Sequence, residues 1–266
     1  MCIRDSYDLG NEFFSTFLDD TRMYSCAIFT KPESSLHEAS ITKIDRICKK
    51  LNLSPADHLL EIGTGWGGFA LYAAKNYGCR ITSTTISQEQ FIFSENLIKK
   101  NGLQDQVTIL KKDFRELEGQ FDKLVSIEMI EAIGHRLYKT FFQKCAQLLK
   151  PEGLLAVQTI TITDNLFKES KDFIDFIKQY IFPGSCIPSI SALCSSATSS
   201  DIKLFHLEDI TPHYARTLKE WRTNFLQNRN RVKDLGFTNA FIRMWLFYLC
   251  YCEGGFMERQ LSLIHI

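Results

Sequence analysis

Residues 58–162 alternate between strand-like and helix-like segments, and this alternation constrains the fold more than any other feature. Capping-box patterns begin at Ser35 and Ser87, and Asn101-Gly102 and Lys150-Pro151-Glu152-Gly153 are typical of helix ends. A strand–helix–strand alternation builds a parallel sheet with crossover helices. The sequence therefore predicts an α/β domain. The predicted strands are His58–Gly63, Arg80–Ile86, Val107–Lys112, Phe121–Ile127 and Leu154–Ile162.

The pattern changes on both sides of this region, which predicts additions to one domain rather than a second domain. We predict a single domain over residues 7–261, with a sheet core at about 58–162 and 202–210 and helical additions at about 7–51 and 163–200. Within these parts, helices are expected at about 167–181 and 214–233. Residues 1–6 and 262–266 differ in character from the sequence between them, and we interpret both as non-native ends.

The composition excludes several classes of protein. Lys and Arg number 31 and Asp and Glu also number 31, so the net charge of zero argues against a generally basic nucleic-acid binder. No run approaches the ~18 apolar residues that a membrane-spanning helix needs. The nine cysteines include no C-x-x-C pair and no histidines at zinc spacing. We therefore predict no metal site, reduced thiols and, without a secretory signal pattern, a cytoplasmic location.

The glycine-rich segment Glu61-Ile62-Gly63-Thr64-Gly65-Trp66-Gly67-Gly68 follows a predicted strand and opens a predicted helix. Such a turn lets a ligand approach the backbone, although an ordinary tight turn has the same spacing. A nicotinamide site should have an acid about 20 residues later, but residues 83–85 are Ser-Thr-Thr. Glu61 instead precedes the first glycine, where it can face the ammonium group of an amino-acid-like ligand. With Asp113 placed to reach an adenine, the pattern resembles S-adenosylmethionine-dependent methyltransferases.

From about Tyr7 to Arg259 the chain resembles the cyclopropane-fatty-acyl-phospholipid synthase family, which includes the mycolic acid cyclopropane synthases. The resemblance implies a Rossmann-like, seven-stranded class I methyltransferase sheet with helical additions that form a lipid site. It also implies methyl transfer from S-adenosylmethionine to a cis double bond of an unsaturated phospholipid acyl chain, and ring closure after a carbocation loses a proton. The motifs that carry it are Tyr7 to Phe14, Tyr24-Ser25-Cys26-Ala27, Gly63 to Gly68, Ser126 to Glu131, Tyr180 to Gly184 and Pro212-His213-Tyr214.

The resemblance also implies which residues form the site. A bound bicarbonate is the expected base, held by Cys26, Glu131, the backbone of Ile160 and Tyr214. Gln158 stands where the family commonly has His, and Gln cannot carry a proton at neutral pH. Glu131 lies among apolar residues, where a carboxylate without a partner is costly, so it is also the strongest catalytic candidate on physical grounds. The expected cofactor-binding residues are Tyr24, Ser25, Glu61, Gly63, Thr64, Gly65, Trp66, Gly67, Thr85, Gln90, Asp113, Phe114 and Arg115.

Two further patterns suggest where a lipid would lie. Phenylalanines cluster at 13, 14 and 17, at 173, 176 and 182, and at 237, 241 and 247, and we expect some of them to line an acyl-chain tunnel. Segment 211–233 has six Lys or Arg and one acid, a net charge of +5, beside an apolar stripe of Leu218, Trp221, Phe225 and Val232. This pattern suits a helix that lies on an anionic membrane surface, although a packed helix with a solvated basic face has the same pattern.

Three functions therefore remain open. The first is a cyclopropane synthase that works peripherally at the inner face of the cell membrane, with no nucleic-acid partner and a homodimer as a candidate assembly. The second is a related lipid C-methyltransferase with a methyl-branched or methylene product, because Gln158 can alter proton removal. The third is a non-catalytic lipid- or cofactor-binding protein.

Overall fold

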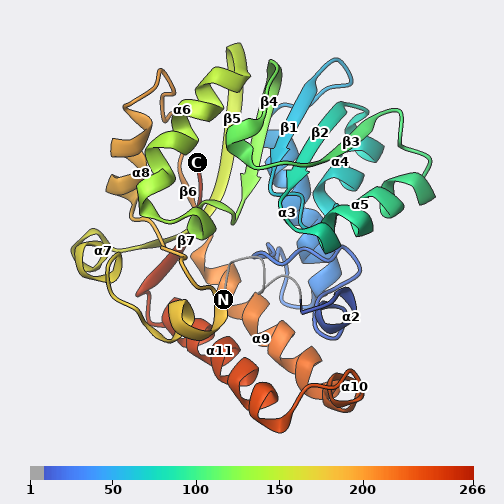
Figure 1. Ribbon diagram of the computed structural model, residues 1–266, viewed down its shortest axis with the longest axis vertical. Helices are drawn as coiled ribbons and strands as arrows, with labels where there is room; N and C mark the ends of the chain where they lie inside the picture. Colours follow the sequence, from blue (N-terminus) through green and yellow to red (C-terminus); the bar gives the residue numbers. More distant parts are fainter. Residues whose placement is uncertain (1–8) are drawn as a thin grey trace.

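The computed structural model describes residues 9–266, so Tyr7, Asp8 and the predicted non-native residues 1–6 lie outside the described part. A seven-stranded sheet crosses the molecule in the order β3-β2-β1-β4-β5-β7-β6 (Figure 1). Strands β1 to β5 are parallel, and β7 pairs antiparallel with β5 and β6. The predicted seven-stranded α/β fold is thus confirmed. The strands are β1 His58–Ile62, β2 Arg80–Thr85, β3 Val107–Lys111, β4 Phe121–Ile127, β5 Leu149–Ile162, β6 Glu208–Asp209 and β7 Leu261–His265.

The helices cover both faces of this sheet and form a separate group beyond one end of it (Figure 1). The α-helices are α2 Asn11–Phe14, α3 Leu36–Lys50, α4 Gly68–Tyr77, α5 Gln88–Lys100, α6 Tyr138–Leu148, α7 Asp164–Ser170, α8 Ile190–Ala197, α9 Thr211–Gln227, α10 Arg229–Asp234 and α11 Asn239–Met257. Short 3₁₀ turns are η1 Phe114–Glu116, η2 Ile130–Ile133 and η3 His135–Leu137, and a π-helical turn is η4 Ile177–Ile181.

Two hydrophobic cores follow from the alternation of side chains along the strands. Leu59 of β1 points into the core formed with α3, α4 and α5, and its neighbour Leu60 points into the core formed with α6 and α8. Both are fully buried, as expected for parallel strands that are covered on two faces. This arrangement leaves the carboxyl ends of the strands free to carry a site.

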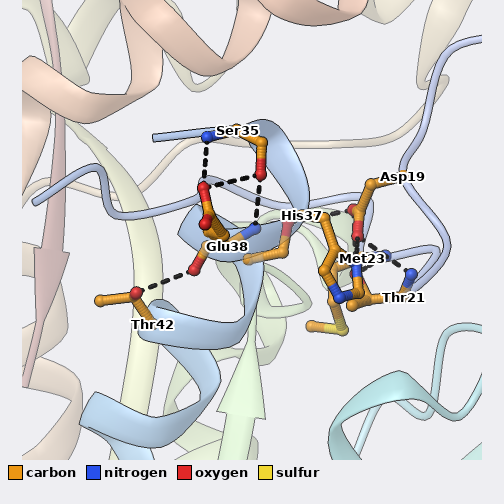
Figure 2. A network of polar contacts seen from close by, with 8 residues as sticks. Asp19, Thr21, Met23, Ser35, His37, Glu38 and Thr42 are labelled. Carbon is orange, nitrogen blue, oxygen red and sulfur yellow. Dashed lines mark hydrogen bonds and ion pairs between the residues drawn. The ribbon is translucent and has the colours of Figure 1, made fainter. Parts of the chain in front are cut away.

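Of the two predicted capping boxes, the one at Ser35 is complete and the one at Ser87 is half formed. At α3 the Ser35 hydroxyl accepts from the Glu38 N–H, and the Glu38 carboxylate accepts from the Ser35 N–H (Figure 2). At α5 the Ser87 hydroxyl accepts from the Gln90 N–H, but the Ser87 N–H donates to Thr85 Oγ1. The Gln90 side chain does not cap the helix. Its Oε1 instead accepts a hydrogen bond from the Thr85 hydroxyl at 2.8 Å.

A third core joins the helical additions, and it decides between the two interpretations of segment 211–233 in favour of a packed helix. Leu218, Trp221, Phe225 and Val232 are all buried, packed with the aromatic residues of α2 and α11. Two of the cations beside the stripe pair within the chain, since Arg222 meets Glu253 and Arg231 meets Glu12. The stripe is therefore the buried face of a packed helix. Among residues 9–266, no helix combines the length and the apolar character needed to cross a membrane.

Five predicted features differ from the observed ones, and the first is β5, which begins at Leu149 and not at Leu154. The strand expected over 202–210 is reduced to β6, and the helix expected over 214–233 is two helices, α9 and α10. The helix expected at 167–181 is α7 followed, after an irregular link, by η4. Residues 262–266, which we placed outside the domain, lie inside the fold because most of them belong to β7.

Candidate functional site

A cavity of about 310 Å³ lies at the carboxyl ends of β1, β2, β3 and β4, where parallel α/β sheets bind their ligands. It brings together every predicted cofactor-binding residue except Gly67 and Arg115. Gly67 is instead the N-cap of α4, with a left-handed φ of 82°. The Arg115 guanidinium pairs with Asp113, its Nη2 lying 2.8 Å from Oδ2, on the exposed side of η1. The members that line the cavity are Tyr24, Ser25, Glu61, Gly63, Thr64, Gly65, Trp66, Thr85, Gln90, Asp113 and Phe114.

The segment that precedes Tyr24 is held against α3 by a polar network. Asp19 accepts from the N–H and the hydroxyl of Thr21, at 3.0 and 2.9 Å, and from the hydroxyl of Ser40. Figure 2 shows Asp19 also meeting His37 of α3. In the glycine loop, Trp66 Nε1 donates to Asn11 Oδ1 at 2.6 Å. The residues after Asp19 are thereby fixed along one wall of the cavity.

Glu61 is a buried carboxylate at the bottom of this cavity. Its Oε2 accepts from the Ser83 hydroxyl at 2.5 Å, and Ser83 Oγ in turn lies 2.6 Å from Thr64 Oγ1. Burial raises the pKa of Glu61 to about 8. A cationic group placed beside it would compensate for the lost hydration of the ionised form. The position therefore suits the ammonium group that the sequence predicted for it.

A second cavity, of about 550 Å³, lies between the sheet edge and the helical additions, and its walls are mostly apolar. It contains Glu131, Ile160 and Tyr214 of the predicted catalytic set. We refer to the first cavity, at the carboxyl ends of the strands, as the cofactor cavity. Three residues, Tyr24, Glu128 and Ala132, line both this second cavity and the cofactor cavity. The two cavities therefore meet at these residues.

The sequence led us to expect that some of the clustered phenylalanines line an acyl-chain tunnel. Among the clustered phenylalanines only Phe182 lines the second cavity. Phe13, Phe14 and Phe17 are fully buried and pack edge-to-face with one another and with the rings of α9 and α11. The rest of the wall comes mainly from Ile160, Ile162, Ile177, Leu218, Tyr248 and Phe256.

Glu128, which the sequence analysis did not single out, lies at the junction of the cavities. Its Oε1 accepts from the N–H of Cys26 at 2.9 Å and from Nε2 of Gln158 at 2.7 Å. Its Oε2 accepts from the Tyr214 hydroxyl at 2.5 Å. Its backbone has a φ of 48°, a left-handed value that non-glycine residues rarely adopt. Such strain clusters at functional sites, and an acid three residues before Glu131 was the available signal.

The other predicted catalytic residues surround this carboxylate. Glu131 Oε1 accepts from the Ile160 N–H at 2.5 Å, and among the described residues its buried Oε2 has no hydrogen-bond partner. Burial, together with the charge of Glu128, raises the pKa of Glu131 to about 8. Burial also raises the pKa of the Cys26 thiol well above its usual value, and its Sγ lies 3.1 Å from the Ala27 carbonyl oxygen. Cys26 thus presents its backbone N–H, and not a thiolate, to the site.

Comparison with known proteins agrees with this geometry. The sequence model of the mycolic acid cyclopropane synthetase family matches residues 1–266. The chain therefore belongs to that family, with the fold of the class I S-adenosylmethionine-dependent methyltransferases.

Two curated relatives and one solved structure illustrate the similarity. Tuberculostearic acid methyltransferase UfaA1 of Mycobacterium tuberculosis is 38% identical over 265 residues, which cover 97% of this chain and 62% of the relative. Cyclopropane-fatty-acyl-phospholipid synthase of Escherichia coli is 37% identical over 263 residues, 98% of this chain and 65% of the relative. The structure of mycolic acid cyclopropane synthase CmaA1 complexed with SAH and CTAB superposes with a TM-score of 0.93 at 29% identity, covering 99% of this chain and 95% of that one. The chain spans less than two thirds of the length of the two curated relatives.

Proposed function

We propose that this chain transfers a methyl group from S-adenosylmethionine to a cis double bond of an unsaturated phospholipid acyl chain, and that the product is a cyclopropane fatty acid. The observation that carries the proposal is the meeting, at Tyr24, Glu128 and Ala132, of a cavity at the carboxyl ends of the strands, which holds the buried carboxylate of Glu61, and a second cavity under the helical additions. A methyl donor in the first cavity and an acyl chain in the second would have only these residues between them. Proximity and the exclusion of water are what a weakly nucleophilic alkene needs.

Each cavity supplies groups suited to its expected occupant. In the cofactor cavity, Glu61 would hold the ammonium group, and Thr85 with Gln90 would hold the ribose hydroxyls. S-adenosylmethionine, when bound, supplies the electrophilic methyl group. In the second cavity, the apolar wall would align the acyl chain, and the carboxylate of Glu128 would stabilise positive charge on carbon. The resemblance also implies a bound bicarbonate as the base, and its expected donors are those that meet Glu128 and Glu131.

A methyl-branched or methylene product is the second candidate. Two observations favour it: Gln158 replaces the usual His, and one relative is named a tuberculostearic acid methyltransferase. Both products begin with the same methyl transfer, so they differ only in the fate of the cation.

Membrane association at the cytoplasmic face is also part of the proposal. Phe173 and Ile174 are each 66% exposed and lie next to Asp175, which lines the second cavity. Exposed apolar side chains at such a position suit contact with the lipid that delivers the acyl chain. We expect a Phe173→Ser/Ile174→Ser variant to bind phospholipid vesicles several-fold more weakly, with unchanged affinity for S-adenosylhomocysteine. Unchanged vesicle binding would reject this contact.

The test of the function is direct. The purified chain is incubated with methyl-labelled S-adenosylmethionine and vesicles of a monounsaturated phospholipid, and the fatty acid methyl esters are analysed by gas chromatography and mass spectrometry. We expect label in a fatty acid that has gained one methylene group, and the fragmentation of derivatised esters separates a ring from a branch. The Glu118→Gln variant is the matched control, because Glu118 is exposed and lines neither cavity. Absence of label in the lipid from every unsaturated phospholipid offered would overturn the proposal.

A further inference from the structure

The carboxylate of Glu128 occupies a site built for an anion. Its two oxygens accept three hydrogen bonds, from the backbone N–H of Cys26, the amide of Gln158 and the hydroxyl of Tyr214. These donors come from three parts of the chain that are far apart in sequence. Buried donors that converge on one carboxylate form a fixed anion site.

These three residues are also members of the set that the resemblance assigns to a bound bicarbonate. The two remaining members, Glu131 and the backbone of Ile160, are hydrogen-bonded to each other. A bicarbonate ion would therefore have to displace the carboxylate of Glu128 from its donors while remaining beside it, and a buried negative charge disfavours a second anion. The residues present do not fit a separate bicarbonate.

We propose that Glu128 takes the place of bicarbonate in this chain and is the catalytic base. The inference rests on the proposed methyl transfer, and it assigns the proton step to a side chain that lines both cavities. The alkene π pair forms the new C–CH₃ bond, and the C–S pair stays on sulfur. A C–H pair of the transferred methyl then closes the ring, and its proton passes to the Glu128 carboxylate, which becomes a neutral carboxylic acid.

The surroundings of Glu128 suit a base that is ionised before the reaction and neutral after it. Burial raises its pKa, which favours proton uptake, while the bonds from Tyr214, Cys26 and Gln158 oppose this. Lys43 is fully buried nearby and donates to Ser25 Oγ, and its charge favours the ionised carboxylate. Glu131 lines the second cavity but not the first, and its side chain accepts a hydrogen bond from the Ile160 backbone.

The backbone at this position makes a decisive variant available. Because φ is 48°, glycine is better tolerated there than any other residue, so Glu128→Gly should fold. It removes the carboxylate and leaves its donors around a space of the same size. Glu128→Gln keeps the shape and removes the charge, so it tests the same role in a variant with little reason to misfold.

The experiment measures turnover of the full chain in buffers freed of carbon dioxide, with and without added bicarbonate. We expect the wild-type rate to be independent of bicarbonate, and both variants to lose roughly 100-fold or more in kcat while still binding S-adenosylhomocysteine. Bicarbonate should restore the rate of Glu128→Gly at least tenfold and leave Glu128→Gln inactive. The exposed Glu118→Gln should behave as wild type.

Three results would each overturn the inference: a wild-type rate that depends on bicarbonate, near-normal turnover of Glu128→Gln, or no rescue of a Glu128→Gly variant that still binds the cofactor product. None of these can be confused with failure of the proposed function, because that failure is an absence of lipid methylation by the wild-type chain in every buffer.

Discussion

Replacement of Gly68 by alanine should damage both the stability of the chain and its cofactor cavity. Gly68 is the first residue of α4, and a Cβ built on it would lie 2.3 Å from the carbonyl oxygen of Thr21. An ordinary contact needs at least about 3.4 Å, so the carbonyl would have to retreat by about 1 Å. Thr21 cannot do so freely, because its N–H and hydroxyl are both bonded to Asp19 (Figure 2).

The change in the free energy of unfolding is the sum of opposing contributions. Alanine gains about 1 kcal/mol over glycine inside a helix. Overpacking costs roughly 1–3 kcal/mol, and each strained hydrogen bond to Asp19 costs about 1 kcal/mol more. We therefore expect a net loss of about 2–4 kcal/mol, or roughly 4–16 °C in Tm for a chain of this size. Because residues 22–25 line the cofactor cavity, affinity for S-adenosylhomocysteine should fall about tenfold.

Thermal unfolding followed by circular dichroism and calorimetric titration with S-adenosylhomocysteine measure the two effects. The matched control is Gly254→Ala in α11, where a Cβ would meet nothing within 4 Å. That variant should gain about 0.5–1 kcal/mol, because only the helix-propensity term remains. An equal rise in Tm for Gly68→Ala, with unchanged cofactor affinity, would refute the argument from close approach.

Three other predictions concern single side chains. Glu131→Gln should lower kcat at least about 100-fold. Its affinity for the cofactor should stay within about twofold of wild type, because Glu131 lines only the second cavity. Near-normal rates in single-turnover kinetics would remove Glu131 from the mechanism. With a pKa of about 8, Glu61 is mostly protonated at pH 7 in the free protein. Binding of an ammonium group favours its ionised form, so titrations of S-adenosylhomocysteine in buffers of different ionisation enthalpy should report release of about 0.8 proton at pH 7. Glu61→Gln should abolish that release, and an unchanged value would rule out Glu61 as its source. Ser35→Ala removes a complete capping box and should cost about 1 kcal/mol, read as a fall in Tm, whereas an unaltered Tm would mean that α3 is fixed by packing alone.

The parts of the fold that local sequence determines were predicted well. Strands β1 to β4 lie within two residues of their expected bounds, because each is a short run rich in apolar or β-branched residues between turn residues. The glycine loop, with Glu61 before it, was placed for the same reason. The predicted cofactor-binding residues mostly lie at the carboxyl edge of neighbouring parallel strands, so the topology alone brings many of them together.

The errors concern apolar residues whose partners come from elsewhere in the chain. A stripe such as Leu218, Trp221 and Phe225 has the same spacing whether a membrane or another helix covers it. In this chain the covering elements are α2 and α11, and α2 lies about 200 residues away in sequence. The same ambiguity put Phe13 among the candidates for a tunnel lining although it belongs to the core.

The site at Glu128 joins two features that look unrelated in the sequence. Gln158 replaces a titratable residue with an amide, which by itself suggests weaker proton chemistry. An amide is nevertheless sufficient where the partner is a carboxylate of the chain itself, because such a partner needs an oriented donor and no compensating proton. Gln158 Nε2 lies 2.7 Å from Glu128 Oε1, on the same oxygen that the Cys26 N–H meets. The amide of Gln158 is therefore the donor that the carboxylate of Glu128 needs. With Glu128 as the base, the site needs no titratable side chain at position 158.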